Sequence, residues 1–180
     1  MSSGALIWDL AAIPAVIVGG TVLHFCFDWS GRRLVFAVFC PVNESVWEHL
    51  KMAYWPLLAW TGAQFAATAA PESLATARAI GFSVMCAVLL ALYVVTDALA
   101  PNAGMRTRLA LDGSIFVVAV ATGQISCHAL LEPLGTVPPG VGPVLLLAPV
   151  AVFAATTYAP PRTRLFEDQI TGGYGVLRRG

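Results

Sequence analysis

Five long apolar segments, separated by breaks rich in glycine and proline, constrain this chain more than any other feature. They cover about residues 6–27, 46–68, 77–99, 109–131 and 141–158. A bilayer core about 30 Å thick needs about 20 predominantly apolar residues per helix, and the segments meet or approach that length. The pattern therefore predicts an all-α, polytopic membrane protein with five transmembrane helices.

The composition excludes several other classes of protein. Of the 180 residues, 58% are hydrophobic and only 11% are charged, whereas soluble domains contain roughly 25% charged residues. Disordered chains are poor in apolar residues, so disorder is excluded too. Net charge is zero and no basic block occurs, so no nucleic-acid partner is expected and the partner is membrane lipid. The four cysteines form no close pair in the sequence, so we expect no disulfide framework.

Arginine placement predicts the orientation in the membrane. With five spans and an outer N-terminus, the inner segments hold eight arginines and the outer ones hold only Arg78. Cytoplasmic loops carry an excess of Lys and Arg. We therefore expect a plasma-membrane protein with its N-terminus outside. Residues 1–159 would form the bundle, and residues 160–180 a cytosolic tail.

Two segments outside the spans call for separate predictions. Residues 34–42 form an apolar run of nine residues, too short to cross a bilayer. We expect this run to be re-entrant or interfacial, because irregular backbone at membrane depth must be surrounded by protein or water. The tail is predicted either to fold back as a lid or to contact anionic lipid through its arginines.

The predicted topology brings ionisable and polar side chains to the cytosolic end of the bundle. A charge at helix mid-depth is unfavourable by roughly 2.5–3.5 kcal/mol, so such groups usually face protein or water and pair with one another. We therefore expect a shared polar cavity. Its residues would be His24, Asp28, Asn43, Glu44, Ser45, Glu48, His49, Asp97 and Asp112.

The residue types in this group are those of a metal site. Two imidazoles with carboxylates suit Zn²⁺, Mn²⁺ or Fe²⁺ rather than Ca²⁺, which prefers oxygen ligands alone. We expect a divalent metal, with zinc favoured, and Glu44 as the general base. The predicted ligands are His24, Asp28, Glu48 and His49. The predicted lining residues are Asn43, Ser45, Asp97 and Asp112.

Several of these residues also have a structural interpretation. Ser45 and Glu48 fit the S-x-x-E capping box at the start of a helix. Asp28 lies four residues before Arg32, and Glu48 three before Lys51, so both acids could form local ion pairs. The sequence leaves the structural and functional interpretations open.

Three stretches carry a resemblance to known proteins. HFCFDWSG, PVNESVWEHLKMAYWP and FEDQITGGYG resemble a family of small uncharacterised bacterial multi-pass membrane proteins, over nearly the whole chain. Locally, NESVWEHL and DWSG are similar to two motifs of the progestin and adipoQ receptor family, which belongs with seven-span, zinc-dependent membrane hydrolases. Here the motifs occur in reverse order, five spans replace seven, and no C-terminal HxxxH occurs.

The functional hypothesis that follows is a metal-dependent membrane hydrolase acting on a lipid or lipid-linked substrate. One alternative is a small ion or solute transporter or channel. Five spans can hardly enclose a wide pathway, so transport would require a homo-oligomer. Another alternative is a structural or assembly subunit of a membrane complex. Whether the protein is an enzyme stays open on the sequence alone.

Overall fold

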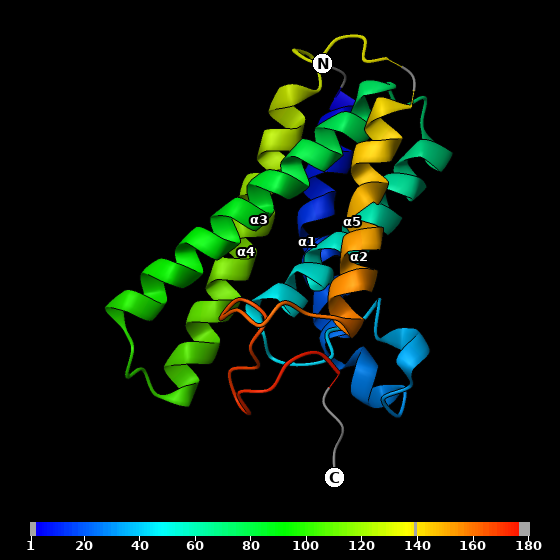
Figure 1. Ribbon diagram of the computed structural model, residues 1–180. Coiled ribbons are helices and arrows are strands. Elements are labelled where there is room, and N and C mark those ends of the chain that lie inside the picture. Colours follow the sequence, from blue (N-terminus) through cyan, green and yellow to red (C-terminus); the bar gives the residue numbers. More distant parts are fainter. Residues whose placement is uncertain (1–2, 139, 177–180) are drawn as a thin grey trace.

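The computed structural model describes residues 3–138 and 140–176, and within them the chain forms a helical bundle (Figure 1). The elements are α1 (Ser3–Trp29), the 3-10 helix η1 (Leu34–Phe36), α2 (Val46–Ala67), α3 (Ser73–Leu99), α4 (Met105–Leu130) and α5 (Val141–Tyr158). The predicted all-α class is confirmed.

Four of the helices, α1, α3, α4 and α5, are long and apolar enough to cross a membrane. This confirms a multi-pass membrane protein. The remaining helix, α2, has a polar first turn that includes Glu48, and Lys51 follows one turn later. Its crossing of the membrane stays a prediction.

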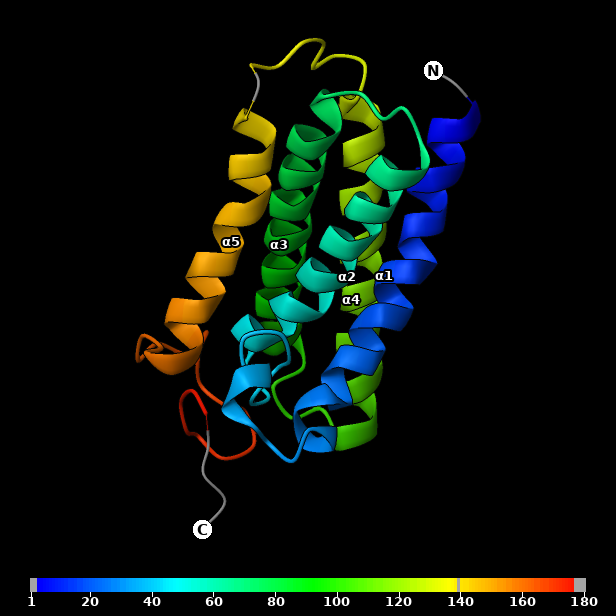
Figure 2. The ribbon, with the colours of Figure 1, turned by 90° about the vertical axis from the view of Figure 1, so that its right-hand side faces the viewer.

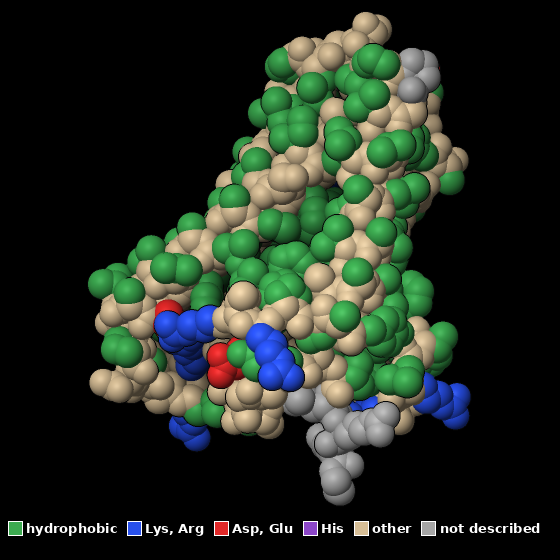
Figure 3. Space-filling view, in the orientation of Figure 1, with side chains coloured by type: hydrophobic (Ala, Val, Ile, Leu, Met, Phe, Trp, Pro, Cys, Tyr) green, Lys and Arg blue, Asp and Glu red, His purple; other side chains and the backbone are tan. Residues whose placement is uncertain are grey.

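The two ends of the bundle differ in charge. The α1–α2 and α3–α4 connections and the segment after α5 lie together at the lower end of Figures 1 and 2. We call this the tail end, and the other the distal end. Lys and Arg gather at the tail end of the face in Figure 3. The distal connections, residues 68–72 and 131–140, contain no Lys or Arg.

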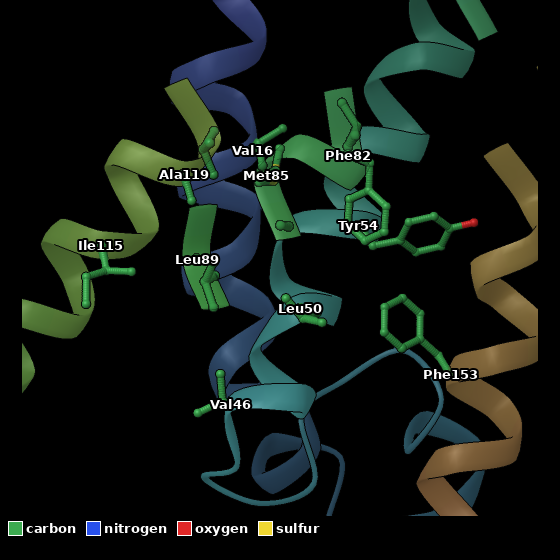
Figure 4. Packing of buried hydrophobic residues seen from close by; sticks show 13 residues of the cluster. Val16, Val46, Leu50, Tyr54, Phe82, Met85, Leu89, Ile115, Ala119 and Phe153 are labelled. Carbon is green, nitrogen blue, oxygen red and sulfur yellow. The ribbon is translucent and has the colours of Figure 1, made fainter. Parts of the chain in front are cut away.

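All five α-helices contribute to one hydrophobic core, shown in Figure 4. Tyr54 of α2 lies at its centre. The ring centroid of Tyr54 is 5.1 Å from that of Phe82 on α3 and 5.4 Å from that of Phe153 on α5. The Tyr54 hydroxyl donates to the Leu146 carbonyl oxygen at 2.8 Å. This contact satisfies the one polar atom that the ring brings into the core.

A backbone contact fixes the crossing of α3 and α4. A Cβ atom on Gly81 would lie 2.7 Å from the carbonyl oxygen of Gly123, and the reverse distance is also 2.7 Å. Only glycine at both positions permits this approach, as expected for helix packing in membranes. From this crossing, α3 and α4 lean as a pair away from α5 toward the tail end (Figure 1).

The prediction that Arg78 lies in an outer connection is wrong. Arg78 is inside α3 and fully buried near the distal end. It donates to Asp9 at 2.7 Å, to Gln64 at 2.8 Å and to Gln124. Asp9 also contacts Nδ1 of His128 at 2.7 Å. A charged side chain can be buried here because acceptors from three other helices bind the two terminal nitrogens of its guanidinium.

The expectation that the cysteines form no disulfide is also wrong. Cys26 and Cys40 are bonded, with Cα atoms 5.7 Å apart. Their proximity arises because the chain reverses after α1. Gly31 and Arg32 have φ angles of 70° and 59°, both in the left-handed region. This tight reversal returns residues 34–40 along the end of α1, which the sequence spacing does not reveal.

Candidate metal centre

Three side chains converge at the tail end: His24 from α1, Glu44 from the loop before α2, and His49 from α2. One ligand atom of each lies within 4.8 Å of the others. Glu44 Oε2 is 3.4 Å from His49 Nε2, and Glu44 Oε1 is 3.9 Å from His24 Nε2. Ligands on a tetrahedral metal with bonds of about 2.1 Å lie about 3.4 Å apart. The three residues could therefore hold a metal with little rearrangement. We call them the triad.

The hydrogen bonding of His49 orients its ring for ligation. Nδ1 lies 2.7 Å from the backbone carbonyl oxygen of Ser45. A carbonyl oxygen only accepts, so Nδ1 carries the hydrogen. The Nε2 atom then faces Glu44. Metal-ligating histidines are usually held in this way, with one ring nitrogen bonded to a carbonyl and the other directed at the metal.

A proton or a metal ion between His49 and Glu44 would stabilise their approach. Neutral Nε2 and a carboxylate oxygen are both acceptors, and they lie 3.4 Å apart. The hydrogen bond with His49 lowers the pKa of Glu44 below its ordinary value; burial opposes this effect, and the charges of both imidazoles add to it. Glu44 is therefore an anion at neutral pH.

His24 completes the triad from the last turns of α1. Its ring centroid is 5.6 Å from that of His49 and 5.0 Å from that of Phe25, which meets it edge-on. Its Nδ1 is buried without a hydrogen-bond partner. The other ring nitrogen, Nε2, faces Glu44 and is the atom available to a ligand.

The loop before α2 holds Glu44 in a fixed position. Ser45 is the N-cap of α2, and its hydroxyl accepts from the Glu48 backbone N–H at 3.3 Å. The Asn43 side chain in turn accepts from the Ser45 N–H at 2.9 Å. Both flanking residues are buried. The carboxylate of Glu44, between them, is turned toward the two histidines.

The C-terminal segment folds back onto this loop, as one of the two sequence interpretations expected. Asp168 Oδ2 accepts from the Glu44 N–H at 3.1 Å. Asn43 Nδ2 donates to the Gly175 carbonyl oxygen at 2.9 Å, and the Trp47 N–H donates to that of Leu165 at 3.1 Å. The two sequence stretches NESVWEHLK and FEDQITGGYG thus meet at the triad.

Asp168 also organises the turn that this segment forms. Its Oδ1 accepts from the N–H groups of Ile170 and Thr171, both at 2.8 Å. Gly172 has a φ of 71°, so a glycine is favoured there. Burial raises the pKa of Asp168, but the N–H groups of Thr171, Glu44 and Ile170 outweigh it, and the pKa lies below its ordinary value. The ionised side chain therefore stabilises both the turn and the Glu44 loop.

The triad opens into a cavity of about 890 Å³ between α1, α2 and α4. The polar part of its wall includes the triad together with Arg108 and Asp112 of α4. The apolar part includes Ile17, Phe25, Leu109 and Phe116, and the tail adds Gln169 and Ile170. The cavity is thus polar at one side and apolar along the helices.

Glu48, predicted as a ligand, is placed elsewhere. Its Oε2 lies 2.6 Å from Lys51 Nζ and accepts from the Val42 N–H at 3.0 Å. Lys51 also donates to Ala37 and Thr157, at 2.9 and 2.6 Å. Both charges are almost completely buried. The geometry of Glu48 is that of a structural ion pair, and it does not join the triad.

Other predicted residues take different positions around the site. Asp28, predicted as a ligand, pairs with Arg32 at 2.7 Å and is exposed. Asp97, predicted as a lining residue, lies between Arg108 and Arg164, at 3.2 and 2.7 Å. Asp112 does line the cavity. Asn43 and Ser45 are buried, and their side chains accept hydrogen bonds from the backbone of the loop and of the first turn of α2.

Sequence reasoning missed two residues at this site, Arg108 and Asp168. Arg108 was counted only for membrane orientation, yet it lies 3.8 Å from Asp112 and lines the cavity. Asp168 stands in the motif FEDQITGGYG. The acids and glycines of that motif, which are unusual in a chain so apolar, were the signal that could have indicated its part in the site.

The fold and this site define a class: a multi-pass helical membrane protein with a candidate His–Glu–His metal centre. A family of unknown function, DUF6512, matches residues 2–176, and the chain belongs to that family. The resemblance over nearly the whole chain is thereby confirmed. No curated protein and no solved structure matches the chain. The similarity to the progestin and adipoQ receptor family stays a prediction.

Proposed function

We propose that this protein is a metal-dependent membrane hydrolase acting on a lipid or lipid-linked substrate at the tail end of the bundle. The observation that carries the proposal is the triad, whose three ligand atoms lie within 4.8 Å of one another. Two histidines and one glutamate are a ligand set of catalytic zinc sites, which leave a coordination position for water. The ligands would be His24, Glu44 and His49.

The bound metal would supply a nucleophile by lowering the pKa of water toward neutrality. In the hydrolysis, the water oxygen would bond to the electrophilic atom of the substrate, the bond from that atom to the leaving group would break, and a water proton would pass to the leaving group. Glu44, predicted as the general base, would instead act as a ligand. Asp112 lines the same cavity from α4. We therefore assign to Asp112 the transfer of the proton from water to the leaving group.

The proposed site faces the cytosol. Apart from the buried Arg78, all Lys and Arg residues belong to helix ends or connections at the tail end or to the C-terminal segment. The positive-inside rule therefore favours a cytosolic tail end. In this orientation α2 would also cross the membrane, which gives five crossings in total. Residues 34–42 would lie in the membrane interface, since Leu34, Val35 and Phe36 are exposed apolar side chains.

The arrangement of polar groups favours an enzyme over a transporter. Within the described residues, the buried polar groups gather toward the two ends of the bundle. The triad and the Glu48–Lys51 pair lie toward the tail end, and the Arg78 network lies at the distal end. The core around Tyr54, Met85 and Leu89 lies between them. A transport pathway needs polar groups or water across this depth, and a packed apolar core provides neither.

Metal analysis of the purified protein tests the proposal. We expect about one zinc or other transition-metal ion per chain in the wild type after purification without chelator. His49→Ala should lose it, whereas His128→Ala should retain it, because His128 lies in the distal network. Equal metal content in the two variants, or none in the wild type, would refute the proposed centre.

A further inference from the structure

We propose that the substrate is a single-chain lipid with an uncharged polar group, and that its hydrocarbon chain lies between α1 and α4. The catalytic part of this inference rests on the proposed function. The binding part does not, since it depends only on the cavity. The inference follows from three features of the cavity: its narrow part between α1 and α4, its exposed apolar side and the charges on its wall.

The cavity is narrow between α1 and α4 beside Gly20. A Cβ atom on Gly20 would lie 2.9 Å from the ring carbon Cζ of Phe116. The two helices therefore approach closely at this level, and most of the residues that line the cavity on α1 and α4 lie on its tail-end side. Packed helices lie 8–10 Å apart. We infer that the space where these two helices part accommodates a single hydrocarbon chain.

The side of the cavity is accessible from the surroundings of the bundle. Leu109, Phe25 and Val117 line it and remain 65%, 48% and 44% exposed. All three belong to helices that are long and apolar enough to cross a membrane. Their exposed surfaces would face lipid. An apolar ligand can thus enter sideways from the bilayer, with no passage through water.

The polar end of the cavity is not suited to a phosphate group. Among the described residues that line it, Arg108 is the single Lys or Arg. Its guanidinium lies 3.2 Å from Asp97 and 3.8 Å from Asp112, so two carboxylates neutralise it. Arg and Lys are common binding groups for phosphate, and the one in this cavity is already paired. An uncharged group, such as an ester or amide, would reach the triad without displacing these ion pairs.

The tail completes the cavity beside the triad. Ile170 and Gln169 line it, and the turn that carries them is held by Asp168. Ile170 is a large apolar side chain on a polar segment and is 73% exposed. A bound lipid chain would cover it. The tail therefore contributes both to the position of Glu44 and to the wall of the binding site.

Gly113 offers a variant that fills the cavity without disturbing the fold. It lines the cavity, and a Cβ atom there would meet nothing within 4 Å. Gly113→Leu therefore places a side chain in the proposed lipid site and improves helix propensity. Gly62 of α2 is the matched control: it is also open, and it does not line the cavity.

The test uses a monoacylglycerol that carries a diazirine in its acyl chain, with the protein in nanodiscs. We expect photolabelling of residues 105–118 in the wild type, with competition by unlabelled monoacylglycerol. Labelling should fall about tenfold in Gly113→Leu, because the leucine side chain would displace roughly two methylene groups of the bound lipid chain. It should remain unchanged in Gly62→Leu. If the variant does not fold, competition between the probe and unlabelled monoacylglycerol in the wild type still tests for a saturable site.

Two results would overturn parts of the inference. Equal, non-saturable labelling of all three proteins would mean ordinary contact with bulk lipid. Stronger labelling by the corresponding lysophosphatidate probe would refute the uncharged headgroup. Metal content of the same samples separates this inference from the proposed function. Saturable labelling without bound metal would support the lipid site and refute the metal-dependent hydrolase. Bound metal without saturable labelling would support the metal centre and refute the lipid site.

Discussion

Asp168 accepts a hydrogen bond from the backbone N–H of Glu44, a residue 124 positions earlier in the chain. Glu44 is also the carboxylate of the triad, so the turn around Asp168 in the tail supports a candidate metal ligand directly. The tail is therefore part of the site and not merely an appendage of the bundle. This relationship leads to the first two predictions.

Asp168→Ala should weaken metal binding without removing any ligand. The substitution deletes the acceptor for Glu44, Ile170 and Thr171, and loss of such supporting contacts typically lowers metal affinity about 10–100-fold. Metal titration of the purified protein measures the change. Glu167→Gln is the control, because Glu167 contacts the Tyr174 hydroxyl and not the Glu44 loop. Unchanged affinity in Asp168→Ala would show that the tail does not position Glu44.

The stabilising effect of Asp168 should depend on pH. Its folded-state pKa is lowered, with the N–H groups of Thr171, Glu44 and Ile170 outweighing burial. Its stabilisation is thus fully present above the unfolded pKa of about 3.9 and is lost as pH falls through the folded value. The difference in thermal midpoint between wild type and Asp168→Asn should be largest near neutral pH and should shrink below about pH 4. A difference that grows on acidification would contradict this assignment.

Glu48→Gln should destabilise the fold and leave bound metal unchanged. The substitution leaves the fully buried Lys51 without its carboxylate, and breaking a buried pair typically lowers the free energy of unfolding by about 3–5 kcal/mol. Ser45→Ala, which removes only the N-cap, should lower it by about 0.5–2 kcal/mol. Thermal unfolding and metal content of both variants are the measurements. Loss of metal in a folded Glu48→Gln protein would restore Glu48 as a ligand.

Cys26 and Cys40 should be thiols in growing cells if the tail end is cytosolic. The structure joins them, but the cytosol keeps such pairs reduced. Rapid alkylation before and after reduction, followed by mass spectrometry, counts the free thiols. Cys86 and Cys127, which are free in the structure, serve as internal references. A disulfide already present in cells would place this end of the bundle on the oxidising side and reverse the proposed orientation.

The positions of the helices could be predicted from hydropathy, because a membrane span must be apolar along its length. The partnership of Arg78 could not, since it depends on Asp9, Gln64 and Gln124 from three other helices. The disulfide was missed for a related reason. It depends on the chain reversal at Gly31 and Arg32, which spacing alone does not show.

The two histidines of the triad could be identified because ionisable side chains are rare in this sequence. The prediction that Glu44 and Glu48 share one cavity is wrong for a specific reason. Ser45 caps α2, so Glu48 belongs to the helix and Glu44 to the loop that precedes it. Glu44 therefore turns toward the histidines, and Glu48 turns toward Lys51.

The buried Asp9–Arg78 pair has a consequence for how the chain is made. Asp9 lies in α1, 69 residues before its counter-ion in α3. During synthesis, the first helix therefore reaches the membrane with a carboxylate whose partner has not yet been translated. The Asp9 carboxylate gains its counter-ion only once α3 has been synthesised, and its histidine partner only once α4 has followed. We therefore expect the distal network to form late in the synthesis of the chain.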